Sequence, residues 1–117
     1  MVKKLLILAL LLPAMAHARY SATIEWIAPT FYVDGTPLEP EEILSFEIVY
    51  GVESGSYTNS VTVSGTAREF TISNLAPGTW YFAATATTVE LQTSELSNEV
   101  MRKFTRGKPK PFTIKIK

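Results

Sequence analysis

Alternating apolar and polar residues predict a succession of short β-strands along this chain. The pattern is clearest between residues 68 and 88, which read as a strand, a tight corner and a second strand. Phe70 and Ile72 alternate with polar neighbours, and Pro77 and Gly78 then break the pattern, as turn residues do. In the second run the more apolar face is predicted to point inward, which leaves Tyr81 outward. The inward set is Trp80, Phe82, Ala84 and Ala86.

Four further segments carry the strand pattern: residues 21–28, 44–51, 57–64 and 97–104. The run 57–64 is short and mostly polar, which suits the edge of a sheet. No segment shows helical periodicity, and turn signals recur at short intervals. These features predict an all-β antiparallel sandwich. Its expected structural residues are Trp26, Phe46, Ile48, Phe70 and Ile72.

Residues 29–44 form a long connection that contains three prolines, which exclude a continuous helix or a central strand. Phe31, Tyr32 and Val33 either pack beneath this loop or are exposed, and packing is favoured because most large apolar side chains find some burial. We predict contact surfaces at residues 29–42 and 88–94. The candidate partner-binding residues of the first loop are Phe31, Tyr32, Asp34, Glu39, Glu41 and Glu42.

The first 18 residues have the layout of a secretory signal peptide. Lys3 and Lys4 precede an uninterrupted apolar run over residues 5–12, and small residues at Ala16 and Ala18 offer a cleavage site. The apolar run is far shorter than the roughly 20 residues that span a bilayer. The sequence therefore predicts a secreted or periplasmic protein that begins near Arg19 and has no transmembrane anchor.

The residue types exclude most catalytic and metal chemistry. The chain has no cysteine, and its single histidine, His17, lies in the predicted signal peptide. Zinc sites and nucleophile pairs of the Ser-His or Cys-His type are therefore not expected. The acids at positions 39, 41 and 42 lack the ligand spacing of a calcium loop and read as a solvated acidic loop. We predict neither enzymatic activity nor a cofactor.

The zero formal net charge is the sum of an acidic body and a basic tail. Residues 19–101 hold eleven acids and two basic residues, whereas residues 102–117 hold seven basic residues and no acid. Such asymmetry is typical of an interaction tail. An exported protein is not expected to bind nucleic acid, so a protein or a polyanion of the cell envelope is the predicted partner.

The end of the tail also has a strand pattern. In residues 111–117, three apolar side chains alternate with one threonine and two lysines. One hypothesis is strand addition to a sheet edge of the same molecule or of a neighbour, with self-association in the second case. The alternative is a disordered basic tail that alternates by chance. The candidate binding residues are Lys108, Lys110, Phe112, Ile114, Lys115, Ile116 and Lys117.

Several motifs together resemble a fibronectin type III domain of the bacterial and phage kind. They are Trp26 before a proline, the corner Leu75-Ala76-Pro77-Gly78-Thr79-Trp80-Tyr81, the run Ser94-Glu95-Leu96-Ser97-Asn98-Glu99-Val100, the loop at residues 34–38, and Tyr50-Gly51 followed by residues 54–57. The resemblance covers residues 21–104. It implies an immunoglobulin-like sandwich over residues 19–105, followed by a basic tail at residues 106–117.

The resemblance also implies that the first strand of the sandwich is short or missing, because only Arg19 and Tyr20 precede residue 21 in the predicted mature chain. One sheet would then have an unpaired edge. The expected function is that of a non-catalytic exported binding or adhesion module. The alternatives are a subunit of an extracellular or virion assembly joined by exchange of the tail strand, and an accessory domain to a polysaccharide-degrading enzyme.

Overall fold

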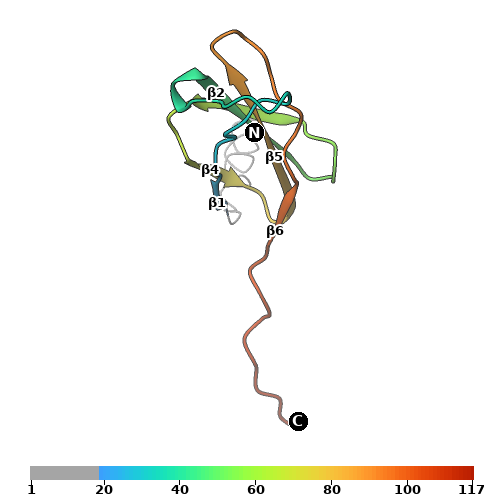
Figure 1. Ribbon diagram of the computed structural model, residues 1–117. Coiled ribbons are helices and arrows are strands. Elements are labelled where there is room, and N and C mark those ends of the chain that lie inside the picture. Colours follow the sequence, from blue (N-terminus) through green and yellow to red (C-terminus); the bar gives the residue numbers. More distant parts are fainter. Residues whose placement is uncertain (1–18) are drawn as a thin grey trace, which may run out of the picture.

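The computed structural model of the protein describes residues 19–117, which form six β-strands and one short 3-10 turn (Figure 1). The elements are β1 (Tyr20–Glu25), the turn η2 (Pro40–Glu42), β2 (Ile43–Gly51), β3 (Asn59–Ser64), β4 (Glu69–Leu75), β5 (Gly78–Thr88) and β6 (Val100–Phe104). The predicted all-β class is therefore confirmed. The predicted signal peptide, residues 1–18, lies outside the described residues. Over residues 19–117, no helix is long and apolar enough to cross a membrane.

The strands form two antiparallel sheets that share one core. β1 pairs with β4, and the second sheet has the order β3-β2-β5-β6. As predicted, the polar strand β3 lies at an edge. One buried cluster contains residues of both sheets, so the sheets pack face to face. The first sheet contributes Ala22, Ile72 and Leu75, and the second contributes Ile48, Phe82 and Phe104.

The corner between β4 and β5 has the predicted register. Trp80 and Phe82 pack in the core, and Phe82 is only 1% exposed, while alternation places Tyr81 on the opposite face. The indole N–H of Trp80 donates to the carbonyl oxygen of Ala76 at 2.9 Å. This bond ties the start of β5 to the corner, and its donor is Trp80, the residue before Tyr81.

Two details of the predicted inward face differ in the structure. Ala84 is only half-buried, because it lines an open groove described below. Ala83, on the face of Tyr81, is buried instead, since its small side chain lies in the middle of the four-stranded sheet. The strand predicted for residues 21–28 also ends early at Glu25, although the N–H of Trp26 still bonds to the carbonyl oxygen of Arg68 at 3.0 Å.

Two serines extend the edge of β5 where β6 no longer reaches. Ser97 donates its N–H to the carbonyl oxygen of Ala84 at 2.8 Å and accepts the N–H of Ala84 on its hydroxyl at 2.9 Å. Ser94 repeats this arrangement with Ala86, at 2.8 and 3.0 Å. The segment that contains both serines is thus held against β5. Each serine hydroxyl takes the place of a backbone acceptor. Ser94 and Ser97, three residues apart, can therefore pair with Ala86 and Ala84, which are two residues apart on β5.

Candidate binding surfaces

The two predicted contact loops lie together at the end of the body away from the tail, and we call residues 29–42 and 88–94 the loop end (Figure 1). The N–H of Val89 donates to the carbonyl oxygen of Glu42 at 2.8 Å, which joins one loop to the other. Tyr32 lies near Glu42 and Glu90. Partial desolvation is the largest cause that raises the pKa of its phenol, and the two carboxylates add to it. The structure therefore brings the candidate residues of the first loop beside the second loop.

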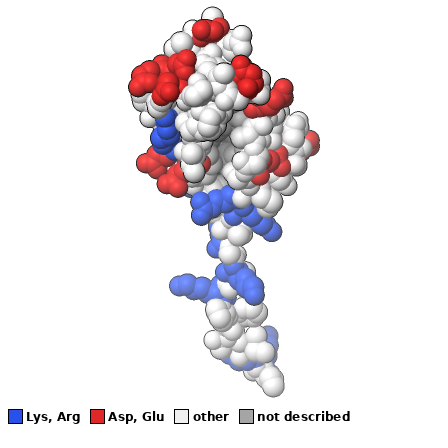
Figure 2. Space-filling model, in the orientation of Figure 1, with Lys and Arg blue, Asp and Glu red and all other residues white. Residues whose placement is uncertain are grey.

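Two of the four candidate acids of the loop end, Asp34 and Glu42, have structural partners. The carboxylate of Asp34 accepts the hydroxyl and the N–H of Thr36 at 2.7 and 2.9 Å, and these bonds lower the pKa of Asp34. The carboxylate of Glu42 accepts the N–H of Glu39 at 2.7 Å, which caps η2. Glu41 is exposed beside them. These acids shape the loop, and Figure 2 shows acidic side chains over the body while the basic ones gather at the tail.

Apolar side chains are exposed at the loop end, contrary to the favoured packing of Phe31 and Val33. Phe31 is 63% exposed, and Val33 is fully exposed. Only Tyr32 is half-buried, where it packs against the cluster of Leu38 and Ile43. The reason is the turn at residues 32–36, closed by the N–H of Tyr32 and the carbonyl oxygen of Thr36, which points alternate side chains outward.

Leu91 is a residue of the loop end that the sequence pattern did not single out. Its backbone has a φ of 63°, in the left-handed region that non-glycine residues seldom adopt, and its side chain is 73% exposed. Holding a leucine in this conformation costs roughly 1–2 kcal/mol. The exposed side chain gains little packing in return, so Leu91 lowers the local stability of this loop.

The candidate residues of the tail are far from those of the loop end. Residues 105–117 extend away from the body, are exposed throughout and contain no strand (Figures 1 and 2). Phe112, Ile114 and Ile116 are at least 82% exposed. The tail therefore presents an apolar and cationic segment that contacts no sheet edge of its own described body.

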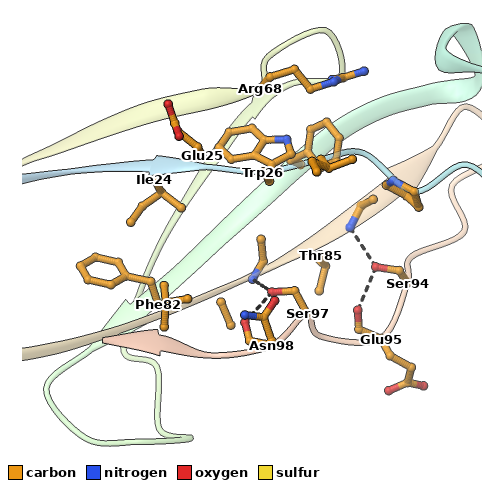
Figure 3. A pocket seen from close by; sticks show the side chains of 17 residues that line it. Ile24, Glu25, Trp26, Arg68, Phe82, Thr85, Ser94, Glu95, Ser97 and Asn98 are labelled. Carbon is orange, nitrogen blue, oxygen red and sulfur yellow. Dashed lines mark hydrogen bonds between the residues drawn. The ribbon is translucent and has the colours of Figure 1, made fainter. Parts of the chain in front are cut away.

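A groove of about 970 Å³ lies between β1 and β5, and no sequence pattern pointed to it (Figure 3). One wall is formed by residues 24–27, the floor by Phe46 and Phe82, and the other wall by residues 83–86 and the segment that holds Ser94 and Ser97. Ile27 at its rim is 96% exposed. The groove lies on the side of β1 that has no strand partner among residues 19–117.

Trp26 forms the upper part of this groove and is incompletely satisfied. Its ring packs against Phe46 at a centroid distance of 5.3 Å, and the guanidinium of Arg68 lies 5.6 Å from the centroid of the Phe46 ring. The indole Nε1 is buried and has no hydrogen-bond partner among the described residues. An unsatisfied buried donor costs roughly 1–3 kcal/mol. Among residues 19–117, the outer side of β1 therefore leaves both apolar surface and a polar group without partners.

Glu99 links the turn after β2 to the start of β6. Its carboxylate accepts the hydroxyls of Ser54 and Tyr57, both at 2.6 Å, and the N–H of Gly55 at 2.8 Å. The hydroxyl of Ser54 is the main cause that holds the pKa of Glu99 below its ordinary value of 4.5. These three hydrogen bonds connect the turn between β2 and β3 to the start of β6.

Replacing Glu99 with glutamine is expected to lower the melting temperature at pH 7 by a few degrees, because the charge-assisted bonds are lost. Since folding lowers the pKa of Glu99, its contribution is present above pH 4.5, the ordinary value, and is lost as the pH falls through the lower pKa of the folded state. Thermal melts of both proteins across acidic pH should therefore converge. Glu53→Gln, an exposed acid in the same turn, is the control and should melt like the wild type. A gap that widens at low pH would contradict this role.

No protein-family model matches the chain, and a search of curated proteins finds no match.

Proposed function

We propose that the protein is an exported, non-catalytic binding module of the fibronectin type III kind, which binds another protein through the loop end. Two facing antiparallel sheets support this assignment, as do the motifs around residues 75–81 and 94–100. The serines of the second motif extend β5, and the corner motif turns the chain into it. Both motifs therefore have a structural reason for their residue types.

The observation that carries the function is the exposure of large apolar side chains on two joined loops. Phe31, Val33, Val89 and Leu91 are all more than half exposed. Loops positioned by a rigid scaffold commonly carry binding residues. Strained backbone tends to persist where it serves a function, and Leu91 is strained and exposed at this end. An apolar centre with an acidic border suits a protein surface that has apolar and basic residues.

Affinity purification from the native host tests this function, with the wild type and Leu91→Gly as baits. Glycine relieves the left-handed backbone, so Leu91→Gly is expected to be at least as stable as the wild type while it loses the partner. Phe31→Ser is a second loop-end variant. Val52→Ser, which replaces an equally exposed apolar residue outside the loop end, is the control.

A partner retained by the wild type and by Val52→Ser, but lost by both loop-end variants, is the expected result. Equal retention by all four proteins would contradict a loop-end site. Retention of no protein by any bait would contradict the binding function.

A further inference from the structure

We propose that the outer edge of β1 takes up residues 111–117 of a second copy of this chain as an added β-strand. The added strand would lie over the groove between β1 and β5 and complete the two-stranded sheet. This inference rests on different residues from the loop-end function and stands or falls separately.

No strand of the described chain pairs with the backbone of β1 along this edge. The N–H of Trp26 bonds to Arg68, and the register continues as Ile24 with Phe70 and Ala22 with Ile72. In an antiparallel pair, successive residues point their N–H and C=O groups alternately toward and away from the partner strand. Thr23 and Glu25 therefore direct theirs away from β4, and no described strand lies on that side. These groups are available to an incoming strand.

The side chains of the tail match the two faces of this edge. On β1, the half-buried side chains of Ile24 and Trp26 pack against the core within the groove, whereas Glu25, at the same wall, is exposed. If Lys115 pairs with Glu25, Ile114 and Ile116 lie beside Ile24 and Trp26 on the groove side. This match holds for a parallel and for an antiparallel added strand, because side chains alternate with a period of two. Apolar residues would then cover the groove while the lysines stay in water.

Charge favours the same pairing. Glu25 lies directly opposite Glu69 in the β1–β4 ladder, and both carboxylates are exposed on the outer face. Like charges in directly opposed positions destabilise a sheet. A lysine on the other side of Glu25 would offset this repulsion. The pair of acids is thus a cost in the isolated molecule that a cationic strand reduces.

The other strand edges fit this tail less well. The outer edge of β6 carries Arg102 and Lys103, which repel a basic segment. β3 is mostly polar, and none of the residues of β4 lines the groove. β1 alone among the edges of the described chain combines free backbone, an open apolar groove and an acidic outer residue.

The geometry of the tail favours a second copy over its own body. The ring of Phe104, at the end of β6, stacks on Tyr20 at 5.1 Å, so the tail leaves the body at the beginning of β1 and runs away from it (Figure 1). Pro109 and Pro111 favour an extended path over a reversal. Seven residues at about 3.3 Å each are enough to pair along the whole of β1. Donor and acceptor are different surfaces, so copies join head to tail.

Sedimentation of the full chain across concentration is the first test, over about 1 µM to about 1 mM, a range that covers weak association. We expect the full chain to self-associate. Glu25→Lys should weaken this association at least tenfold, and Lys115→Glu should weaken it by a similar factor. The double variant, which exchanges the two charges, should recover the association at least in part. Glu25→Lys also places a lysine opposite Glu69, so it should not impair folding. Glu47→Lys, the same change on an exposed position of β2, is the matched control and should associate like the wild type.

A disulfide trap identifies the partner strand, because the natural chain has no cysteine. Paired residues of adjacent strands have Cα atoms about 5.5 Å apart, within the range that a disulfide bridges. Glu25→Cys combined with Lys115→Cys should form disulfides between chains, and Glu47→Cys with Lys115→Cys should form far fewer. The proposal would be overturned if the protein is a monomer at every concentration, or if Lys115→Glu leaves the association unchanged. A disulfide that forms within one chain would also overturn it.

Discussion

Replacing Phe82 with alanine is expected to lower the free energy of unfolding by about 3–5 kcal/mol. Phe82 is 1% exposed and lies in the cluster that joins the two sheets, where its ring stacks on Tyr50 at 6.0 Å. The substitution removes a ring from a site that both sheets enclose, and the neighbours can close the cavity only in part. Since small domains have a total stability of roughly 5–15 kcal/mol, this change alone should bring the protein close to unfolding.

Urea denaturation of dilute protein measures this effect as a shift in the midpoint at a constant slope. Phe112→Ala is the matched control, because the same side chain is removed from an exposed position in the tail. It should leave the midpoint unchanged. A loss of less than about 1 kcal/mol for Phe82→Ala would place this residue outside a packed core.

Gly65→Ala is expected to destabilise the fold by about 3 kcal/mol or more. Gly65 follows β3 at the crossing to the other sheet and donates its N–H to the carbonyl oxygen of Leu44 at 3.0 Å. A Cβ at this position would overlap the carbonyl oxygen of Ile43 and lie 2.7 Å from its carbonyl carbon. These are backbone atoms of β2, which cannot move aside as a flexible side chain can. The crossing would have to shift away from β2.

Gly35→Ala separates this steric cost from the general cost of replacing glycine. At Gly35 the added Cβ meets open space, but the φ of 88° is unfavourable for alanine. That conformation costs roughly 1–2 kcal/mol, so Gly35→Ala should melt between the wild type and Gly65→Ala. Equal melting temperatures for Gly35→Ala and Gly65→Ala would contradict the steric clash between a Cβ at residue 65 and the backbone of β2.

The strands and the corner could be predicted from the sequence because each depends on neighbouring residues. The period of two around Phe82, broken by Pro77 and Gly78, fixes both the turn and the buried face. The tryptophan at position 80 supplies the bond that the corner needs, and its neighbour Tyr81 is left on the other face. Local pattern was sufficient there.

The binding surfaces depend on residues that meet only in the fold. The groove joins β1 to β5 and to the serine segment, which are some sixty to seventy positions apart in sequence. Glu99 forms hydrogen bonds with a turn more than forty residues away. The turn at residues 54–57 and the run at residues 94–100 can each be recognised in the sequence, but their contact cannot. The exposure of Phe31 and Val33 follows from the direction of one turn, and the strain at Leu91 from a single φ angle. None of these is encoded in a periodic pattern.

The edge of β1 that lacks a partner strand within residues 19–117 connects the fold to the proposed self-association. An edge with free backbone groups, beside an open groove, is an aggregation hazard in most proteins. Here the lysines of the tail restrict which strand fits, since an acidic or neutral strand would not offset the charge of Glu25 and Glu69. The same edge can therefore be specific rather than merely adhesive.

Amide hydrogen exchange along β1 tests this account most directly. In dilute protein, the N–H groups of Thr23 and Glu25 should exchange rapidly, while those of Ile24 and Trp26, which face β4, should be protected. As the concentration rises, Thr23 and Glu25 should become protected in the wild type but not in Lys115→Glu. Rapid exchange of Thr23 and Glu25 at every concentration, or protection that Lys115→Glu leaves intact, would contradict it.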